Sequence, residues 1–512
     1  MANSRSENVV KNATATITLQ VVKNLLDFVG RIVFVRILGA EYTGVNSLFT
    51  EILTVLSFTE LGIGNAMIFS LYKPLAEKDT EKIKSLMKLY AVSYRVIGVV
   101  IAITGICVIP FLNLIVGEVS YVKENIVALY LLFLANTVIS YFFIYNRSLI
   151  VADQKSYLVG IYREVFHAIR VIAQTIFLIA TKSIIPYLVI MIICTFLNNV
   201  FVTYQAKRMY PYLKDKDVKP LDKSEAKGIF SNVKALVVYK IGTIMLESTD
   251  SIFISILVNV LTVGLYGNYK MIINVFKTVG NQVMESLIAS IGNLNAEATK
   301  EKKLIVFNDI YYINAWFYGF TTVGLGLFLT PVVKLFFGAE NDIAEVAVWA
   351  ACTYYYVANM HYPCYSFRTT AGLFVYGKYV PLACTILNIV LNIVLGVKFQ
   401  LVGILLASVI SRMFTFEIID PLLIFKRVFE KNPIGYFLKY ILYFILAAAN
   451  AVVCYIIMNK ISLDGILGLI IKLVVVSIVY NLIFFFATCR SASFIDVKNR
   501  VLHMLKNKEL KK

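Results

Sequence analysis

VIGVVIAITGICVI, at residues 96–109, contains no charged side chain and lacks the polar–apolar alternation of a half-buried strand. Residues 474–487 show the same pattern, which is typical of a helix surrounded by lipid. The whole chain is similarly apolar: 59% of its 512 residues are hydrophobic and 16% are charged. In globular proteins about 45–50% of the residues are usually hydrophobic and about 25% are charged. We therefore expect an all-α polytopic membrane protein.

The composition also argues against several other classes of protein. The seven cysteines are scattered without a Cys-x-x-Cys pair, and there are only three histidines, so we expect no zinc site, redox motif, disulfide framework or bound cofactor. The net charge of +18 is better explained by the excess of basic residues in cytoplasmic loops than by nucleic-acid binding. The polar residues 1–12 and the absence of a clear cleavage site favour an uncleaved anchor over a signal peptide.

Spans of about 20 residues can be placed fourteen times along the chain. The expected spans are 13–38, 43–72, 86–110, 120–146, 154–181, 184–206, 229–256, 262–294, 308–333, 343–367, 379–397, 401–425, 434–459 and 463–488. Thirty lysines and arginines then fall on one side of the membrane and five on the other, which predicts that both termini are cytoplasmic. Arg147, Lys155, Arg368 and Lys378 are interpreted as cytoplasmic topology anchors.

An internal repeat relates the two halves of the chain. Gly105, Pro110, Leu114 and Gly117 recur 221 residues later as Gly326, Pro331, Leu335 and Gly338. Arg147 corresponds to Arg368 at the same offset, and Gly44 to Gly264 at 220. The alternative is that glycine and proline recur only because span ends favour them. The repeat predicts two pseudo-symmetric six-helix lobes, at 1–206 and 229–425, joined by a basic cytoplasmic linker at 207–228. A further helix pair (426–488) and a basic cytoplasmic tail (489–512) follow.

Charged residues within the expected spans predict a hydrated cavity between the two lobes, because such residues rarely face lipid. The basic candidates for holding an anionic headgroup are Arg31, Arg95, Arg163, Arg170, Lys240, Lys270, Lys277 and Arg412. The acidic candidates for ion coupling or gating are Asp27, Glu51, Glu247, Asp250 and Glu285, with Glu164 as a further acid at this depth. Guanidinium groups suit phosphate and carboxylate, so the basic excess predicts an anionic cargo.

Two of these features also have structural interpretations. Asp27 can pair with Lys23 or Arg31, four residues away on either side, and such a pair would simply fix the first helix in place. His167 is interpreted as a hydrogen-bonded neighbour of the arginines on its helix face rather than as a proton carrier.

Three local motifs resemble a known family. RILGAEYTGV at residues 36–45, ELGIGNA at 60–66 and YKPLAEKD at 72–79 are similar to the polysaccharide-transporter family, the O-antigen and capsule repeat-unit flippases. That family belongs to the multidrug/oligosaccharidyl-lipid/polysaccharide (MOP) superfamily. The resemblance implies alternating access in the bacterial cytoplasmic membrane, coupled to a proton or sodium ion. It also implies transfer of an undecaprenyl-pyrophosphate-linked oligosaccharide to the outer leaflet, with the polysaccharide polymerase and chain-length machinery as partners. In that family plan, helices 13 and 14 would shelter the lipid tail in a groove.

Two alternatives remain. A multidrug antiporter of the same superfamily typically has twelve spans and an acidic cavity, so the two extra helices and the basic excess argue against it. A membrane polymerase or glycosyltransferase usually has a long external loop, whereas every external connection expected here is short.

Overall fold

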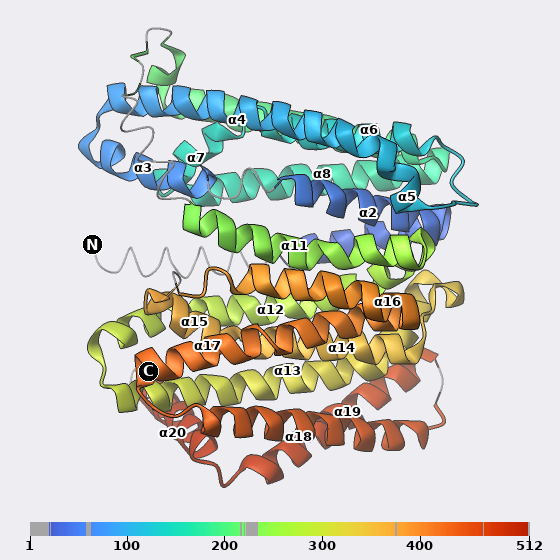
Figure 1. Ribbon diagram of the computed structural model, residues 1–512, viewed down its shortest axis with the longest axis vertical. Helices are drawn as coiled ribbons and strands as arrows, with labels where there is room; N and C mark the ends of the chain where they lie inside the picture. The colour runs from blue at the N-terminus through green and yellow to red at the C-terminus, as the bar shows by residue number, and fades with distance from the viewer. Residues whose placement is uncertain are drawn as a thin grey trace. The chain divides into compact units, whose positions relative to one another are not determined.

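The computed structural model describes residues 20, 22–57, 63–215, 218–219, 221, 234–373, 376–463 and 465–509 (Figure 1). Parts of several predicted features therefore lie outside the described residues. They are residues 13–19 and 21 of the first span, 58–62 of the second span with 60–62 of its family motif, 216, 217, 220 and 222–228 of the predicted linker, 229–233 of the seventh span, 464 of the last span and the last three residues of the tail.

The described chain divides into two compact units, Met1–Leu265 and Tyr266–Lys512. Unit 1 begins with a helix over residues 22–38. Its other helices are α2 (Ala40–Leu56), α3 (Ile63–Glu77), α4 (Thr80–Val108), η2 (Ile109–Phe111), α5 (Leu112–Val116), α6 (Ile126–Tyr141), α7 (Tyr145–Ala152), α8 (Ser156–Thr181), α9 (Ile184–Met209), η3 (Pro211–Lys214) and α11 (Lys234–Leu257). Within this unit α8 and α6 pack on α9, α4 packs on α6, and α11 packs on α2.

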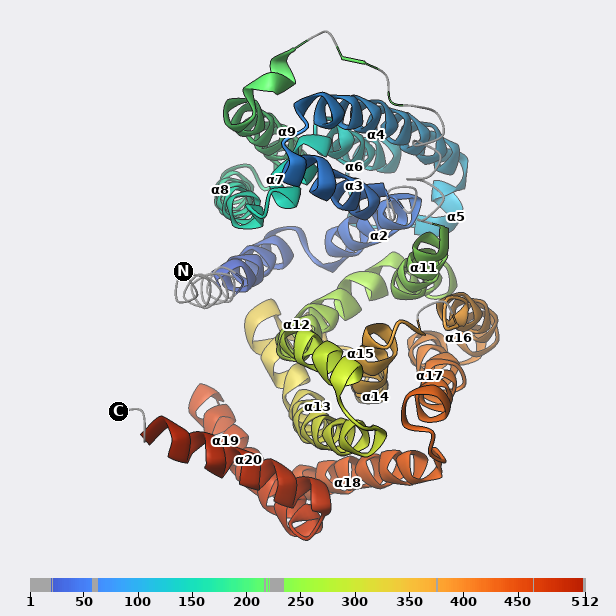
Figure 2. The same ribbon diagram turned by 90° about the vertical axis from the view of Figure 1, so that its left-hand side faces the viewer.

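The boundary between the units falls inside α12 (Val260–Glu297), so most of this helix belongs to unit 2. The unit continues with α13 (Lys300–Phe337), η4 (Ala339–Asn341), α14 (Glu345–Met360), α15 (Tyr362–Thr370), α16 (Val380–Met413), α17 (Phe416–Ile424), the π-helical turn η6 (Phe425–Phe429), α18 (Ile434–Asn459), α19 (Gly465–Thr488) and α20 (Ala492–Glu509). The last three helices all pack against α13, which places the predicted extra pair and the tail on one flank of this unit (Figure 2).

Polar residues just outside the apolar runs determine where several helices begin. The side chain of Asn125 accepts hydrogen bonds from the backbone of Val127 and Ala128 at the start of α6. Ser183 caps α9 in the same manner, through the backbone N–H of Ile185. Each cap satisfies a backbone donor that the helix itself leaves free.

The all-α membrane fold predicted from the sequence is confirmed. In the described part of the chain seven helices are long and apolar enough to cross a membrane, or eight if α6 and α7, bent by 43°, form one span. The two spans predicted at 379–397 and 401–425 fall on either side of a break in α16, where Gln400 has a φ of 51°. The number fourteen itself remains a prediction.

The residues of the sequence repeat have matching structural roles in the two units. Gly117 and Gly338 each end a helix with a positive φ, 69° and 107° respectively. A side chain at Gly105 would meet Leu134 of α6, and one at Gly326 would meet Trp349 of α14. The helix pairs α4–α6 and α13–α14 thus correspond, and each is packed around a glycine of the repeat.

The repeat glycines near the boundary contact each other directly within unit 1. A Cβ atom added to Gly44 would overlap the carbonyl oxygen of Val260, and one added to Gly264 would overlap that of Ala40. The first turns of α2 and α12 therefore cross with their backbones in contact, which only glycine permits at this spacing.

Candidate functional site

A pocket of about 500 Å³ in unit 1 is lined by two of the residues predicted to bind the cargo, Arg163 and Arg170. This volume lies within the range of small-molecule sites, about 300–1,000 Å³. The helix over 22–38, α8 and α9 supply its walls. The lining residues are Gln20, Lys23, Arg163, Glu164, Phe166, His167, Arg170, Cys194, Thr195 and Asn198.

A chain of polar contacts runs along one side of this pocket. Lys23 Nζ lies 3.8 Å from one carboxylate oxygen of Asp27, and His167 Nε2 lies 2.7 Å from the other. Arg170 donates a hydrogen bond of 2.8 Å to His167 Nδ1. Because a guanidinium group only donates, Nδ1 is the acceptor and Nε2–H donates to Asp27. His167 is therefore a neutral link between the arginine and the aspartate, in agreement with its interpretation from sequence.

This geometry determines which charges in the pocket are already balanced. Asp27 has two partners, Lys23 and His167, and Glu164 accepts a 2.8 Å hydrogen bond from Arg163 Nε. Arg170 instead donates to an uncharged nitrogen, so that contact leaves its positive charge available. The lining residues Lys23, Arg163 and Arg170, counted together with Glu164 and the neighbouring Asp27, leave one positive charge in excess. The Arg163 side chain is 55% exposed, and it can reach a ligand with the nitrogens that Glu164 does not use.

Arg31 lies beside this network. Tyr187 of α9 is within electrostatic reach of Arg31, Arg170 and Asp27, and its ring packs edge-on against Phe34 at 5.0 Å. The structure therefore brings together four of the predicted site residues: Asp27, Arg31, Arg163 and Arg170. The polar lining from α9, Thr195 and Asn198, was not predicted, because single hydroxyl and amide groups in an apolar span carry little signal.

Of these four, Arg163 and Arg170 line the pocket and Asp27 and Arg31 lie beside it; the other predicted residues lie elsewhere. Arg95 is exposed on α4, Glu51 is partly buried on α2, and on α11 Glu247 is exposed while Asp250 is buried. The side chain of Lys240 lies outside the described residues. In unit 2, Lys270, Lys277 and Arg412 are partly buried and Glu285 is exposed. A common cavity between the lobes stays a prediction.

Arg368 has a different role from the topology anchor predicted for it. Its side chain is 2% exposed and donates a 2.5 Å hydrogen bond to Asp420 Oδ1 in α17. The other oxygen of Asp420 lies 2.5 Å from His361 Nε2. Arg368 is therefore buried in an ion pair within unit 2. The sequence placed it at a span end, but α15 carries it inward toward α17.

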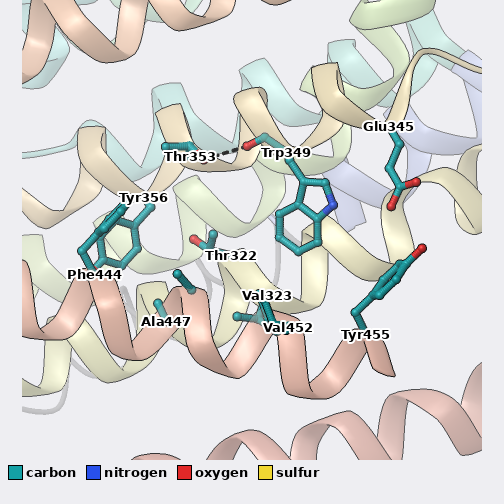
Figure 3. Close-up of a pocket in the computed structure, with 12 residues that line it drawn as sticks. Thr322, Val323, Glu345, Trp349, Thr353, Tyr356, Phe444, Ala447, Val452 and Tyr455 are labelled. Atoms are coloured by element: carbon teal, nitrogen blue, oxygen red, sulfur yellow. Dashed lines mark hydrogen bonds between the residues drawn. The ribbon is translucent and has the colours of Figure 1, made fainter. Parts of the chain in front are cut away.

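A second pocket, an apolar groove of about 370 Å³, lies between α13, α14 and α18 of unit 2 (Figure 3). Aromatic rings line it along its length, with Tyr356 and Phe444 toward one end and Trp349, Tyr455 and the carboxylate of Glu345 toward the other. Small side chains of α18 form part of its wall: Ala447, Ala448 and Ala451.

Comparison with known proteins identifies the fold. No family model matches the chain, and no curated protein matches its sequence. The solved lipid II flippase MurJ, in an inward closed conformation, superimposes with a TM-score of 0.66 at 16% identity, covering 93% of this chain and 100% of that one. An inward-facing multidrug resistance MATE transporter of the MOP superfamily gives a TM-score of 0.57 at 13% identity, covering 79% and 96%.

A third solved structure is a MOP superfamily transporter from Pyrococcus furiosus, described by the reverse polarity of its binding pocket. Its TM-score is 0.54 at 14% identity, covering 82% of this chain and 95% of that one. This chain thus has the fold of the solved MOP-superfamily proteins and is a multi-pass membrane protein.

Proposed function

We propose that this multi-pass membrane protein is a transporter that moves a lipid-linked oligosaccharide from the cytoplasmic to the outer leaflet of a bacterial membrane. The specific cargo proposed is an undecaprenyl-pyrophosphate-linked repeat unit for capsule or O-antigen-like polysaccharide. The family resemblance of the three sequence motifs and the fold shared with the lipid II flippase MurJ support this proposal.

The charge of the unit 1 pocket is the observation that carries the proposal. Lys23, Arg163 and Arg170 line a space large enough for a phosphorylated sugar headgroup. The guanidinium groups can donate paired hydrogen bonds to phosphate oxygens, which a cationic cargo cannot accept. The pocket also has polar groups suited to sugar hydroxyls, Gln20, Thr195 and Asn198.

The apolar groove of unit 2 supports a lipid-linked cargo. Part of an acyl or prenyl chain fits a groove of about 370 Å³ lined by aromatic rings and alanines. α18, one of the helices outside the repeat, contributes one wall. A soluble anion would need the basic pocket but would have no use for such a groove.

A multidrug or cation antiporter is the alternative, because MATE transporters share the fold. Such a protein needs a carboxylate to receive a cation. Beside the unit 1 pocket, Asp27 is paired with Lys23 and His167, and in the pocket one oxygen of Glu164 is paired with Arg163, while its other oxygen has no hydrogen-bond partner among the described residues. The carboxylates there are thus already compensated, which favours the anionic cargo.

A complementation experiment tests the proposal. A strain lacking the gene should accumulate lipid-linked repeat units on the cytoplasmic leaflet and lose surface polysaccharide. Arg170→Gln should fail to restore export while reaching the membrane at normal levels. The control is Arg208→Gln, which changes an exposed arginine on α9 outside the pocket and should restore export. Normal export by Arg170→Gln, or a deletion strain that changes only drug resistance, would contradict the proposal.

A further inference from the structure

Glu417 of α17 is a buried acid that the sequence analysis did not single out. Its residue is 5% exposed, and neither carboxylate oxygen has a hydrogen-bond partner among the described residues. Buried polar groups without partners are uncommon in folded proteins, and each one calls for a functional or structural reason.

Several polar side chains surround Glu417, and together they form what we call the Glu417 cluster. Tyr311, Tyr356, Tyr436, Tyr440 and Cys364 lie within electrostatic reach of its carboxyl, and Tyr311 and Tyr436 pack with ring centroids 5.1 Å apart. They come from α13, α14, α15 and α18. The hydroxyls of Tyr311, Tyr356 and Tyr440 also have no hydrogen-bond partner among the described residues. The cluster therefore gathers several polar groups in an otherwise apolar core.

The charged neighbours of Glu417 have opposite effects on its carboxyl. Burial without a donor disfavours the carboxylate, and so does the negative charge of Asp420 one turn along α17. Arg412, whose guanidinium lies 4.9 Å above the Phe416 ring, favours the carboxylate. Asp420 is itself compensated by Arg368 and His361. The two acids of α17 thus have different environments: Asp420 has fixed partners, whereas Glu417 has no hydrogen-bond partner among the described residues.

We propose that Glu417 is a proton-exchange site of unit 2 and that its proton is the coupling ion of transport. Loss of the proton breaks the carboxyl O–H bond, transfers the proton to a water molecule and leaves a carboxylate near Arg412. Uptake from water on the other side reverses the step. A metal cation suits this cluster poorly, because it would meet one carboxylate and the positive charge of Arg412.

Tyr356 connects the cluster with the apolar groove. Its ring lines the groove and packs against Phe444 at a centroid distance of 5.8 Å, while its hydroxyl belongs to the Glu417 cluster (Figure 3). Occupation of the groove therefore acts on a residue within electrostatic reach of Glu417. This coupling role rests on the proposed function, whereas the protonation of Glu417 can be measured without any cargo.

Infrared difference spectroscopy of the full chain in lipid nanodiscs tests the protonation. A pH change should produce a carboxylic-acid C=O band that is absent in Glu417→Gln. The matched control is Glu41→Gln, since Glu41 is similarly buried at 8% but accepts a 2.8 Å hydrogen bond from the backbone of Tyr121. That variant should keep the band. Tyr440→Phe, which removes no charge, should shift the band. A band that persists unchanged in Glu417→Gln would overturn the proposal.

Proteoliposomes with a pH-sensitive dye inside test the coupling. With undecaprenyl-pyrophosphate-linked glycan as the probe, an imposed pH gradient should accelerate flipping by the parent protein and leave Glu417→Gln unaffected. Equal acceleration of both would refute the coupling role even if the glycan is transported. If Glu417 titrates but this glycan is not transported, the proposed cargo fails while the proton site stands.

Discussion

Gly44→Ala tests the direct contact between the first turns of α2 and α12. The new Cβ would overlap the carbonyl oxygen of Val260, a backbone atom that cannot rotate away. Overpacking a tight interface costs about 1–3 kcal/mol. Because the obstacle is backbone, we take the upper part of that range and subtract about 0.5–1 kcal/mol for the better helix propensity of alanine. The expected net destabilisation is about 2 kcal/mol.

Gly160→Ala is the matched control for this prediction. Gly160 also lies inside a helix, α8, but no atom lies within 4 Å of the Cβ that it would gain. The Gly160→Ala variant should therefore be more stable than the parent protein by roughly 0.5–1 kcal/mol. Thermal unfolding of the purified proteins in detergent can be followed by intrinsic fluorescence. The unfolding temperature of Gly160→Ala should lie above that of the parent, and the unfolding temperature of Gly44→Ala should lie below it.

Gly264→Ala probes the same crossing from the other helix, since its Cβ would overlap the carbonyl oxygen of Ala40. Once one substitution has separated the two backbones, the second should cost less, so the double variant should lose less stability than the sum of the single variants. Gly44→Ala as stable as Gly160→Ala would refute the backbone contact.

Three further predictions concern other parts of the chain. Asp420→Asn removes the partner of the buried Arg368 and should lower the free energy of unfolding by about 3–5 kcal/mol. Thermal unfolding in detergent measures this loss, and a variant as stable as the parent would contradict the buried ion pair. Ala447→Trp should fill the apolar groove and block export at a normal protein level, whereas Ala449→Trp, on the same helix but outside the groove, should not; equal export by both would speak against the lipid tail site. Partial burial alone would raise the pKa of Asp153, but hydrogen bonds from Lys155 and Tyr210, of 2.6 and 2.7 Å, hold that pKa below its usual value. A lowered pKa stabilises the fold at neutral pH, and this contribution is lost as the pH falls below about 4. Asp153→Asn should therefore be less stable than the parent, by up to about 1 kcal/mol, at neutral pH but not in acid; a difference that does not depend on pH would contradict this reasoning.

Patterns that depend on local sequence predicted the fold well. Hydropathy placed helices throughout the chain, and the break near Gln400 falls between two predicted spans. Gly117 and Gly338, which the repeat pairs, both end helices with a positive φ. These features follow from the composition and backbone preferences of short segments, which are visible in one sequence.

Contacts between helices were predicted less completely. Asp27 was assigned partners four residues away on its own helix; the contact with Lys23 is present, but the shorter one comes from His167 on α8. The packing of two helices decides such a contact, and spacing along one helix carries no information about it. For the same reason the burial of Arg368 against α17 was missed.

The Glu417 cluster could in part have been anticipated. Glu417 and Asp420 are two acids within an expected span, and intramembrane acids are a recognised sign of function. Only the arginine of that span was singled out. Which of the two acids has fixed partners depends on His361 and Arg368, which lie 59 and 52 positions before Asp420, and only the structure shows it.

Transfer of a pyrophosphate-linked lipid by the purified protein tests the central claim most directly. In proteoliposomes, undecaprenyl-pyrophosphate-linked oligosaccharide should become accessible to an external glycan-modifying enzyme. The parent and Arg208→Gln should move it, and Arg170→Gln should not. A neutral glycolipid with the same sugars should move poorly. If the neutral lipid crosses as fast as the pyrophosphate-linked one, or if Arg170→Gln is fully active, the basic pocket does not hold the cargo.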